Sequence, residues 1–127
     1  MCIRDRLNMA ALLASLAEFR EAGMDRLREK SLALTAFLER GIHSVAASTG
    51  ARLEILTPED PEARGCQLSV VAHGQGKALF DHLTARGVIV DWREPAVIRL
   101  APVPMYNRFA DVARFLVLLE EGLRAAK

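Results

Sequence analysis

Cysteine is scarce in this chain of 127 residues, where Cys2 and Cys66 are the only two. Two cysteines so far apart supply neither a disulfide framework nor a zinc site, so we assign them no chemistry and expect free thiols. The three histidines, His43, His73 and His82, show no metal-ligand spacing with a cysteine or a carboxylate. We therefore expect no metal site.

An excess of charge of one sign is also lacking, because 17 basic and 16 acidic residues leave a net charge of +1. A nearly neutral chain offers no basic field to hold nucleic acid or an anionic membrane surface. No apolar run approaches the roughly 20 residues that cross a bilayer, and the N-terminus lacks the order of a signal peptide. We therefore expect neither nucleic acid nor a membrane as a partner, and we expect a cytoplasmic location.

The residues that are present suit one globular domain, since 51% of them are hydrophobic and can form a core. The first six residues, MCIRDR, match neither a helix face nor a strand alternation. We interpret residues 1–8 as a junction or artefact segment and residues 9–127 as the domain. In this interpretation the chain is the tail of something longer.

Apolar spacing predicts four helices and four strands. The helices are expected at 9–22, 24–47, 75–86 and 109–123, and the strands at 52–56, 65–72, 88–91 and 97–100. Gly23 closes the first helix, Gly87 takes the left-handed position after the third, and Asn107 caps the last. The order lacks the regular strand-helix alternation of a parallel sheet. We expect an α+β fold with a mostly antiparallel sheet of three to four strands, covered by helices on one face.

The leading functional candidate is an arginine inside an apolar strand. Arg99 lies just before Pro102 and Pro104, which lack backbone N–H groups and therefore end the strand. A guanidinium is costly to bury alone, so its donors need a carboxylate, a phosphate or solvent. Arg99 either binds a ligand from the end of the strand, or forms an internal salt bridge, or faces water.

Other polar residues near Arg99 also admit more than one interpretation. Asp91 and Glu94 either form a pair of acids for general acid-base chemistry, or partner Arg93 or Arg99, or are solvated. Tyr106, beside the proline turn, either borders a pocket or packs inside the domain.

Three segments together resemble the C-terminal part of kynureninases. They are residues 64–69 (RGCQLS), 86–91 (RGVIVD) and 98–107 (IRLAPVPMYN), in matching order and spacing, and the resemblance extends back through residues 22–31 to about Met9. Kynureninases are pyridoxal 5'-phosphate enzymes of the aspartate aminotransferase fold (fold type I), and they work as homodimers. A small C-terminal domain packs on a large cofactor-binding domain. The resemblance implies hydrolysis of L-kynurenine or 3-hydroxykynurenine to anthranilate or 3-hydroxyanthranilate plus L-alanine, in tryptophan breakdown.

The resemblance also implies a role for individual residues. It places the family's arginine for the substrate α-carboxylate at Arg99, and it leaves Arg64, Tyr106 and Asn107 as pocket-border residues that either touch substrate or shape the turn. An arginine fork gives a carboxylate two parallel charge-assisted hydrogen bonds, which fix its orientation.

The cofactor is expected outside this chain. The family's Schiff-base lysine and its phosphate contacts lie in the large domain, and none of Lys30, Lys77 and Lys127 has a suitable setting here. We therefore expect no catalytic or cofactor-binding residue in the chain, which alone is then inactive. Two alternatives remain: a free-standing module that binds amino acids through Arg99, and a dimerisation module that uses apolar surface on the first two helices.

Overall fold

The computed structural model describes residues 3–125, so Met1, Cys2, Ala126 and Lys127 lie outside the described residues. The elements are α1 (Ile3–Ala22), α2 (Met24–Thr49), β1 (Leu53–Ile55), the short 3-10 helix η1 (Pro61–Ala63), β2 (Leu68–Ala72), α3 (Gly76–Ala85), β3 (Asp91–Arg93), β4 (Val97–Leu100) and α4 (Phe109–Ala125).

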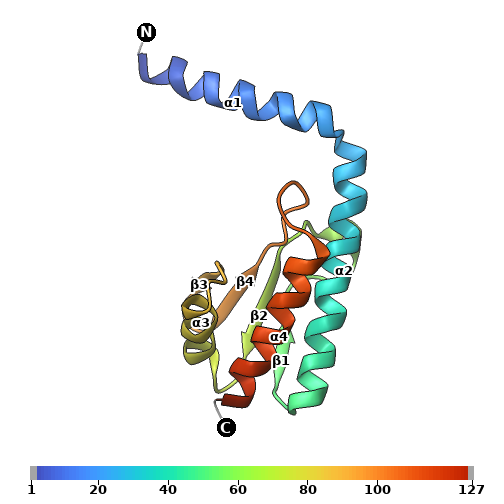
Figure 1. Ribbon diagram of the computed structural model, residues 1–127, viewed down its shortest axis with the longest axis vertical. Coiled ribbons are helices and arrows are strands. Elements are labelled where there is room, and N and C mark those ends of the chain that lie inside the picture. The colour runs from blue at the N-terminus through green and yellow to red at the C-terminus, as the bar shows by residue number, and fades with distance from the viewer. Residues whose placement is uncertain (1–2, 126–127) are drawn as a thin grey trace.

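The four strands form one antiparallel sheet in the order β1-β2-β4-β3. Helices α2 and α4 lie side by side against one face of this sheet, and α3 lies beside the end that carries β3 and β4 (Figure 1). The α+β fold, the antiparallel sheet and its helical cover on one face are confirmed.

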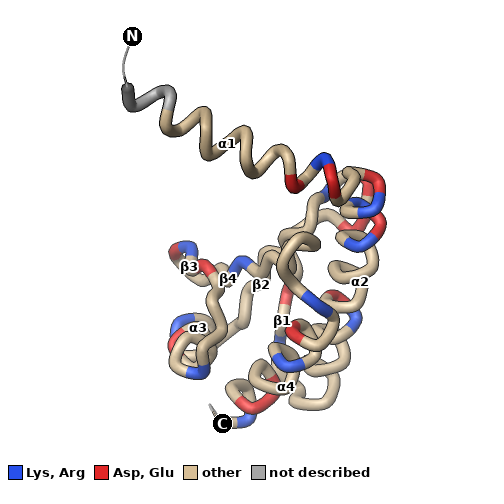
Figure 2. The backbone as a smooth tube through the Cα atoms, turned by 45° about the horizontal axis from the view of Figure 1, so that its top comes forward, with Lys and Arg blue, Asp and Glu red and all other residues tan. Residues whose placement is uncertain are grey.

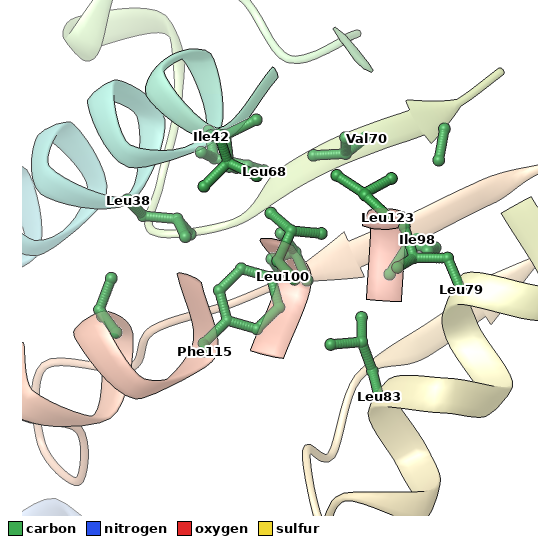
Figure 3. Close-up of a cluster of buried hydrophobic side chains, with 14 of the residues drawn as sticks. Leu38, Ile42, Leu68, Val70, Leu79, Leu83, Ile98, Leu100, Phe115 and Leu123 are labelled. Carbon is green, nitrogen blue, oxygen red and sulfur yellow. The ribbon is translucent and has the colours of Figure 1, made fainter. Parts of the chain in front are cut away.

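The core lies between this face of the sheet and the helices. Strand side chains alternate between the two faces, so β2 and β4 each give every second residue to the core. The strands contribute Leu68, Val70, Ala72, Ile98 and Leu100, and the helices contribute mainly Leu34, Leu38, Ile42, Leu79, Leu83, Phe115, Leu119 and Leu123 (Figure 3). The residues between them in β2 and β4 point to the opposite face, which carries no helix in the described part of the chain.

Two glycines end helices where the sequence predicted. Gly87 has a φ of 80°, and its N–H donates to the carbonyl of Thr84 while the next N–H, of Val88, donates to the carbonyl of Leu83. This pair of bonds is the Schellman motif that a left-handed glycine permits. Gly23, with a φ of 81°, separates α1 from α2 and turns the chain sharply between them (Figure 1).

Helix α1 projects away from the rest of the domain (Figure 1). It begins at Ile3, earlier than the expected start at Met9, and among the described elements it packs against α2. The leucines of its expected apolar face, Leu12, Leu13 and Leu16, are therefore exposed. The helix was predicted from its composition, but its apolar residues lie outside the core of this domain.

The third strand differs from the prediction, which placed it at 88–91, whereas β3 spans Asp91–Arg93. The register pairs Asp91 with Arg99, so continuing the ladder backwards would set residue 88 opposite Pro102. A proline has no N–H to donate to the ladder. The N–H of Val88 is already used in the turn after α3. The β-branched run at 88–90 therefore stays outside the sheet.

A buried and an exposed leucine give a matched test of this packing. Leu34 is 0% exposed and Leu13 is 63% exposed, and both lie in helices. We expect Leu34→Ala to lower the free energy of unfolding by about 2–5 kcal/mol, because it removes buried apolar contacts and leaves a cavity. Leu13→Ala should change it by less than about 0.5 kcal/mol. Urea unfolding of both variants measures this, and equal losses would contradict the described core.

Candidate functional site

The arginine of the fourth strand lies on the open face of the sheet. Arg99 is in the middle of the local sheet, opposite Ser69 of β2 on one side and opposite Asp91 of β3 on the other. Its neighbours Ile98 and Leu100 point into the core, so the alternation of the strand sends Arg99 away from the helices. Its side chain is 32% exposed. The charged residues of β3 and β4 lie next to each other on the side of the sheet where β3 is the edge strand (Figure 2).

Arg99 is paired with the carboxylate opposite it. A single oxygen, Oδ2 of Asp91, accepts hydrogen bonds from Nε of Arg99 at 2.6 Å and from its Nη2, and it also accepts from Nε of Arg93 at 3.0 Å. The hydrogen bond from Arg99 is the main cause that lowers the pKa of Asp91 below its ordinary value of 3.8. Asp91 is thus a carboxylate at neutral pH. Of the interpretations given above for Arg99, the structure shows the internal salt bridge, on the partly exposed face of the sheet.

The second acid of this turn has a different partner. Glu94 accepts a hydrogen bond from Nε1 of Trp92 at 2.8 Å, within the same short segment. The two carboxylates are therefore held by different donors. Among the described residues no hydrogen bond joins Asp91 to Glu94, as a proton-sharing pair would require.

Arg64 lies elsewhere, against helix α2. Its guanidinium binds both carboxylate oxygens of Glu39, at 3.2 and 2.5 Å, and donates to the carbonyl of Pro58 at 3.1 Å. The side chain is 7% exposed. This two-pronged pair anchors the loop between β1 and β2 to the helix, where Arg28 also donates to the carbonyl of Pro61 at 2.6 Å.

Asn107 and Tyr106 belong to the turn after β4. The side-chain oxygen of Asn107 accepts from the N–H of Val103 at 2.8 Å, and the N–H of Asn107 donates back to the carbonyl of Val103 at 2.8 Å. Asn107 therefore closes the turn. The predicted helix cap is wrong, because the oxygen of Asn107 accepts from Val103 and, among the described residues, from no N–H of α4; the Asp111 carboxylate instead accepts from the N–H of Arg108 at 2.8 Å. Tyr106 is 72% exposed.

The four predicted residues do not converge on one pocket in this chain. Within residues 7–125 no hydrogen bond or ion pair joins any two of Arg99, Arg64, Tyr106 and Asn107. A groove of about 350 Å³ lies between α4 and the segment after α3, and Asn107 and Leu100 help to line it. Arg99 is not among its lining residues, because it points to the other face. Of these four residues, Arg99 is the one that presents a partly exposed guanidinium to a ligand.

The described lysines do not fit a pyridoxal phosphate site. A Schiff base needs an uncharged amine within reach of the cofactor. The ammonium of Lys30 donates to the carbonyl of Pro104 at 2.7 Å, and that of Lys77 pairs with Asp81 at 2.7 Å beside the ring of Phe80. Both amines are thus engaged as cations in structural contacts.

Within residues 7–125, whose side chains the structure describes, no group of three or more His, Cys, Asp or Glu side chains is arranged to hold a metal ion. No helix in the same part of the chain is long and apolar enough to cross a membrane.

Comparison with known proteins identifies the domain. Residues 27–119 match the family model described as the kynureninase C-terminal domain. Curated proteins named kynureninase are 55% identical over 117 residues in Xanthomonas euvesicatoria, 47% over 117 in Flavobacterium psychrophilum and 47% over 122 in Monosiga brevicollis. These matches cover 90–94% of this chain and 26–28% of the relatives, so the chain spans about a quarter of their length.

The sequence did not identify Glu39 as the residue that holds Arg64 in place. Glu39 lies 25 positions before its partner Arg64, and only the folded loop brings the two side chains together. A carboxylate on the half-buried side of a predicted helix was the available signal, but it does not identify a partner. Glu39 now explains why Arg64 is fixed.

The pair Glu39–Arg64 predicts an acid-sensitive contribution to stability. The hydrogen bond from Arg64 is the main cause that lowers the pKa of Glu39 below its ordinary value of 4.5. The stabilisation is therefore present above that value and is lost as the pH falls through the lower folded-state pKa. We expect Glu39→Gln to cost about 1–3 kcal/mol at about pH 7 and much less at about pH 2.

Urea unfolding at the two pH values measures this difference. The control is Glu62→Gln, since the Glu62 carboxylate is exposed and lies 3.5 Å from Arg28. An exposed pair contributes little, so the control should change stability by less than about 1 kcal/mol at either pH. A Glu39→Gln loss that does not shrink in acid would argue against this ion pair.

Proposed function

The chain belongs to the kynureninase family, and we propose that it is the C-terminal domain of a kynureninase that hydrolyses L-kynurenine or 3-hydroxykynurenine to anthranilate or 3-hydroxyanthranilate plus L-alanine. The proposal extends to the whole protein, a cytoplasmic, pyridoxal 5'-phosphate-dependent homodimer of tryptophan breakdown. Identity of 47–55% to curated kynureninases along nearly the whole chain supports it.

In this proposal Arg99 binds the α-carboxylate of the substrate. Its position on the open face of the sheet is the observation that carries the proposal, since it presents a partly exposed guanidinium where no helix covers the strand. Two parallel hydrogen bonds from such a fork, each worth about 1.5–3 kcal/mol, hold a carboxylate in one plane. Binding energy of this kind positions the bond that breaks elsewhere in the substrate.

The turn after β4 supports this arginine. Asn107 and Val103 bond each other twice across the turn, and Lys30 of α2 donates to the carbonyl of Pro104 at 2.7 Å. The turn is thereby tied to the helical layer, and its prolines restrict the backbone further. A rigid strand end lowers the entropy cost of holding Arg99 in place.

The rest of the proposed active site is supplied from outside this chain. Because neither Lys30 nor Lys77 fits a Schiff base, we propose that the cofactor is held by the part of the enzyme that the chain does not include. The chain alone should then bind no pyridoxal 5'-phosphate specifically and turn over no kynurenine.

The alternative is a module that works without catalysis. The exposed leucines of α1 favour a dimerisation role over a purely monomeric one, because apolar surface of this kind is usually covered by a partner. A free-standing amino-acid-binding module would use the same Arg99. Both alternatives predict that the domain adds nothing to turnover when it is joined to a large domain.

The test uses a joined enzyme, in which this domain replaces the matching segment of the Xanthomonas euvesicatoria relative. We expect Arg99→Ala to raise KM strongly, to lower kcat and to reduce kcat/KM for L-kynurenine about 100-fold or more, since two charged hydrogen bonds are lost. Arg99→Lys should recover only part of this loss, because an ammonium keeps the charge but not the fork. Steady-state kinetics measures both.

The control is Arg86→Ala, which removes another surface arginine with one carboxylate partner, Glu121 at 2.6 Å, on the helical side. This variant should keep kcat/KM within about twofold of the value for the joined enzyme without the substitution. The α-carboxamide of kynurenine serves as a second probe: Arg99→Ala should no longer distinguish acid from amide. Unchanged kinetics and unchanged acid preference in Arg99→Ala would refute the assignment.

A further inference from the structure

We propose that Asp91 is the positioning residue of Arg99: it holds one edge of the guanidinium so that the other edge stays free for the substrate carboxylate. This inference rests on the proposed function of Arg99. Asp91 and Arg99 face each other across neighbouring strands, in register. The orientation of the arginine is thus built into the pairing of β3 with β4.

The hydrogen bonds use only part of the guanidinium. An arginine has five N–H donors, of which Nε and one Nη form a side edge and the two Nη form an end edge. Oδ2 of Asp91 accepts from Nε and Nη2, which is the side edge. Nη1 of Arg99 has no hydrogen-bond partner among the described residues. A carboxylate can therefore approach the end edge and form two parallel bonds without displacing Asp91.

This geometry indicates that Asp91 positions Arg99 and does not compete with the substrate carboxylate for it. A carboxylate that imitated the substrate would take the end edge and would have to leave before the substrate bound. Asp91 takes the side edge through one oxygen and is itself held by Arg93 at 3.0 Å. Asp91 is thus fixed from two sides, and it can remain in place while a ligand binds.

The charges of this cluster also suit an anionic ligand. Arg93, Asp91 and Arg99 together carry two positive charges and one negative charge, so one positive charge is left over. The hydrogen bond from Arg99 lowers the pKa of Asp91, so the carboxylate stays ionised at neutral pH. Without Asp91, two neighbouring guanidinium groups would repel each other, and Arg99 would lose its fixed plane.

The first test measures kinetics in the joined enzyme. Asp91→Ala should raise KM for L-kynurenine and reduce kcat/KM about 10- to 100-fold, because a misplaced arginine no longer orients the substrate. Asp91→Asn keeps an oxygen acceptor in the same place and should recover most of this loss. Asp81→Ala, which removes a carboxylate paired with Lys77, is the matched control and should have no effect.

A double variant separates positioning from a general role in stability. If Asp91 acts through Arg99, then Asp91→Ala should cause no further loss of kcat/KM in an Arg99→Ala background. Equal losses in both backgrounds would overturn the proposal. A lower KM in Asp91→Ala would also overturn it, since that result means that Asp91 competes with the substrate.

The outcomes for the two proposals differ. If Arg99→Ala is impaired and Asp91→Ala is not, then the positioning role fails and the proposed function stands. If Arg99→Ala is unimpaired, then both fail.

A second measurement uses the chain itself and needs no turnover. Nuclear magnetic resonance of the 15N-labelled chain should show a slowly exchanging Nε–H of Arg99 at neutral pH. This signal should exchange faster in Asp91→Ala and should persist in Asp91→Asn and Asp81→Ala. Fast exchange in the unsubstituted chain would overturn the proposed side-edge contact.

Discussion

The structure depends on one constraint, the alternation of side chains along β4 between two different faces. Ile98 and Leu100 are buried under the helices, so Val97 and Arg99 must point to the face without helices. A slip of one residue in register would move Arg99 into the core and would bring apolar side chains into solvent. Burial of an unpaired guanidinium is prohibitive in free energy. The hydrophobic core therefore fixes the register, and the register fixes where the candidate site lies.

An arginine paired with a carboxylate occurs at two places that matter here, and its use differs between them. Arg64 is nearly buried, and the end edge of its guanidinium is taken by both oxygens of Glu39, while its Nη1 also donates to a backbone carbonyl. Arg99 is partly exposed, and Asp91 offers it a single oxygen. The difference lies in whether the end edge of the guanidinium is occupied, and this is why we assign a structural role to Arg64 and propose a binding role for Arg99.

The fold could be predicted largely from local patterns. The apolar spacing of residues 24–47 and 109–123 identified the two helices that cover the sheet, and Gly23 and Gly87 marked the ends of α1 and α3. The third strand was misplaced because β-branched residues at 88–90 look like a strand. They stay unpaired because continuing the ladder would set residue 88 opposite Pro102, and this register is known only from the folded sheet.

The candidate site was predictable only in part. Arg99 stood out because a charge in an apolar strand needs a partner, and Asp91, only eight positions away, was among the partners weighed. The contact of Arg64 with Glu39 depends on how a loop folds back on a helix, and local sequence patterns do not specify such contacts. The resemblance to kynureninases, rather than any pattern of spacing, gave Arg99 its proposed role.

Energetics favours the domain as part of a larger site over a free-standing binder. Two charge-assisted hydrogen bonds from Arg99 provide about 3–6 kcal/mol in total. Association with a small ligand costs about 4–15 kcal/mol in lost freedom, and even a Kd of 1 mM requires a net gain of about 4.1 kcal/mol. A single guanidinium on an open sheet face therefore cannot hold an amino acid firmly. Additional contacts to the same substrate are needed, and a large domain facing Arg99 is the arrangement that would supply them.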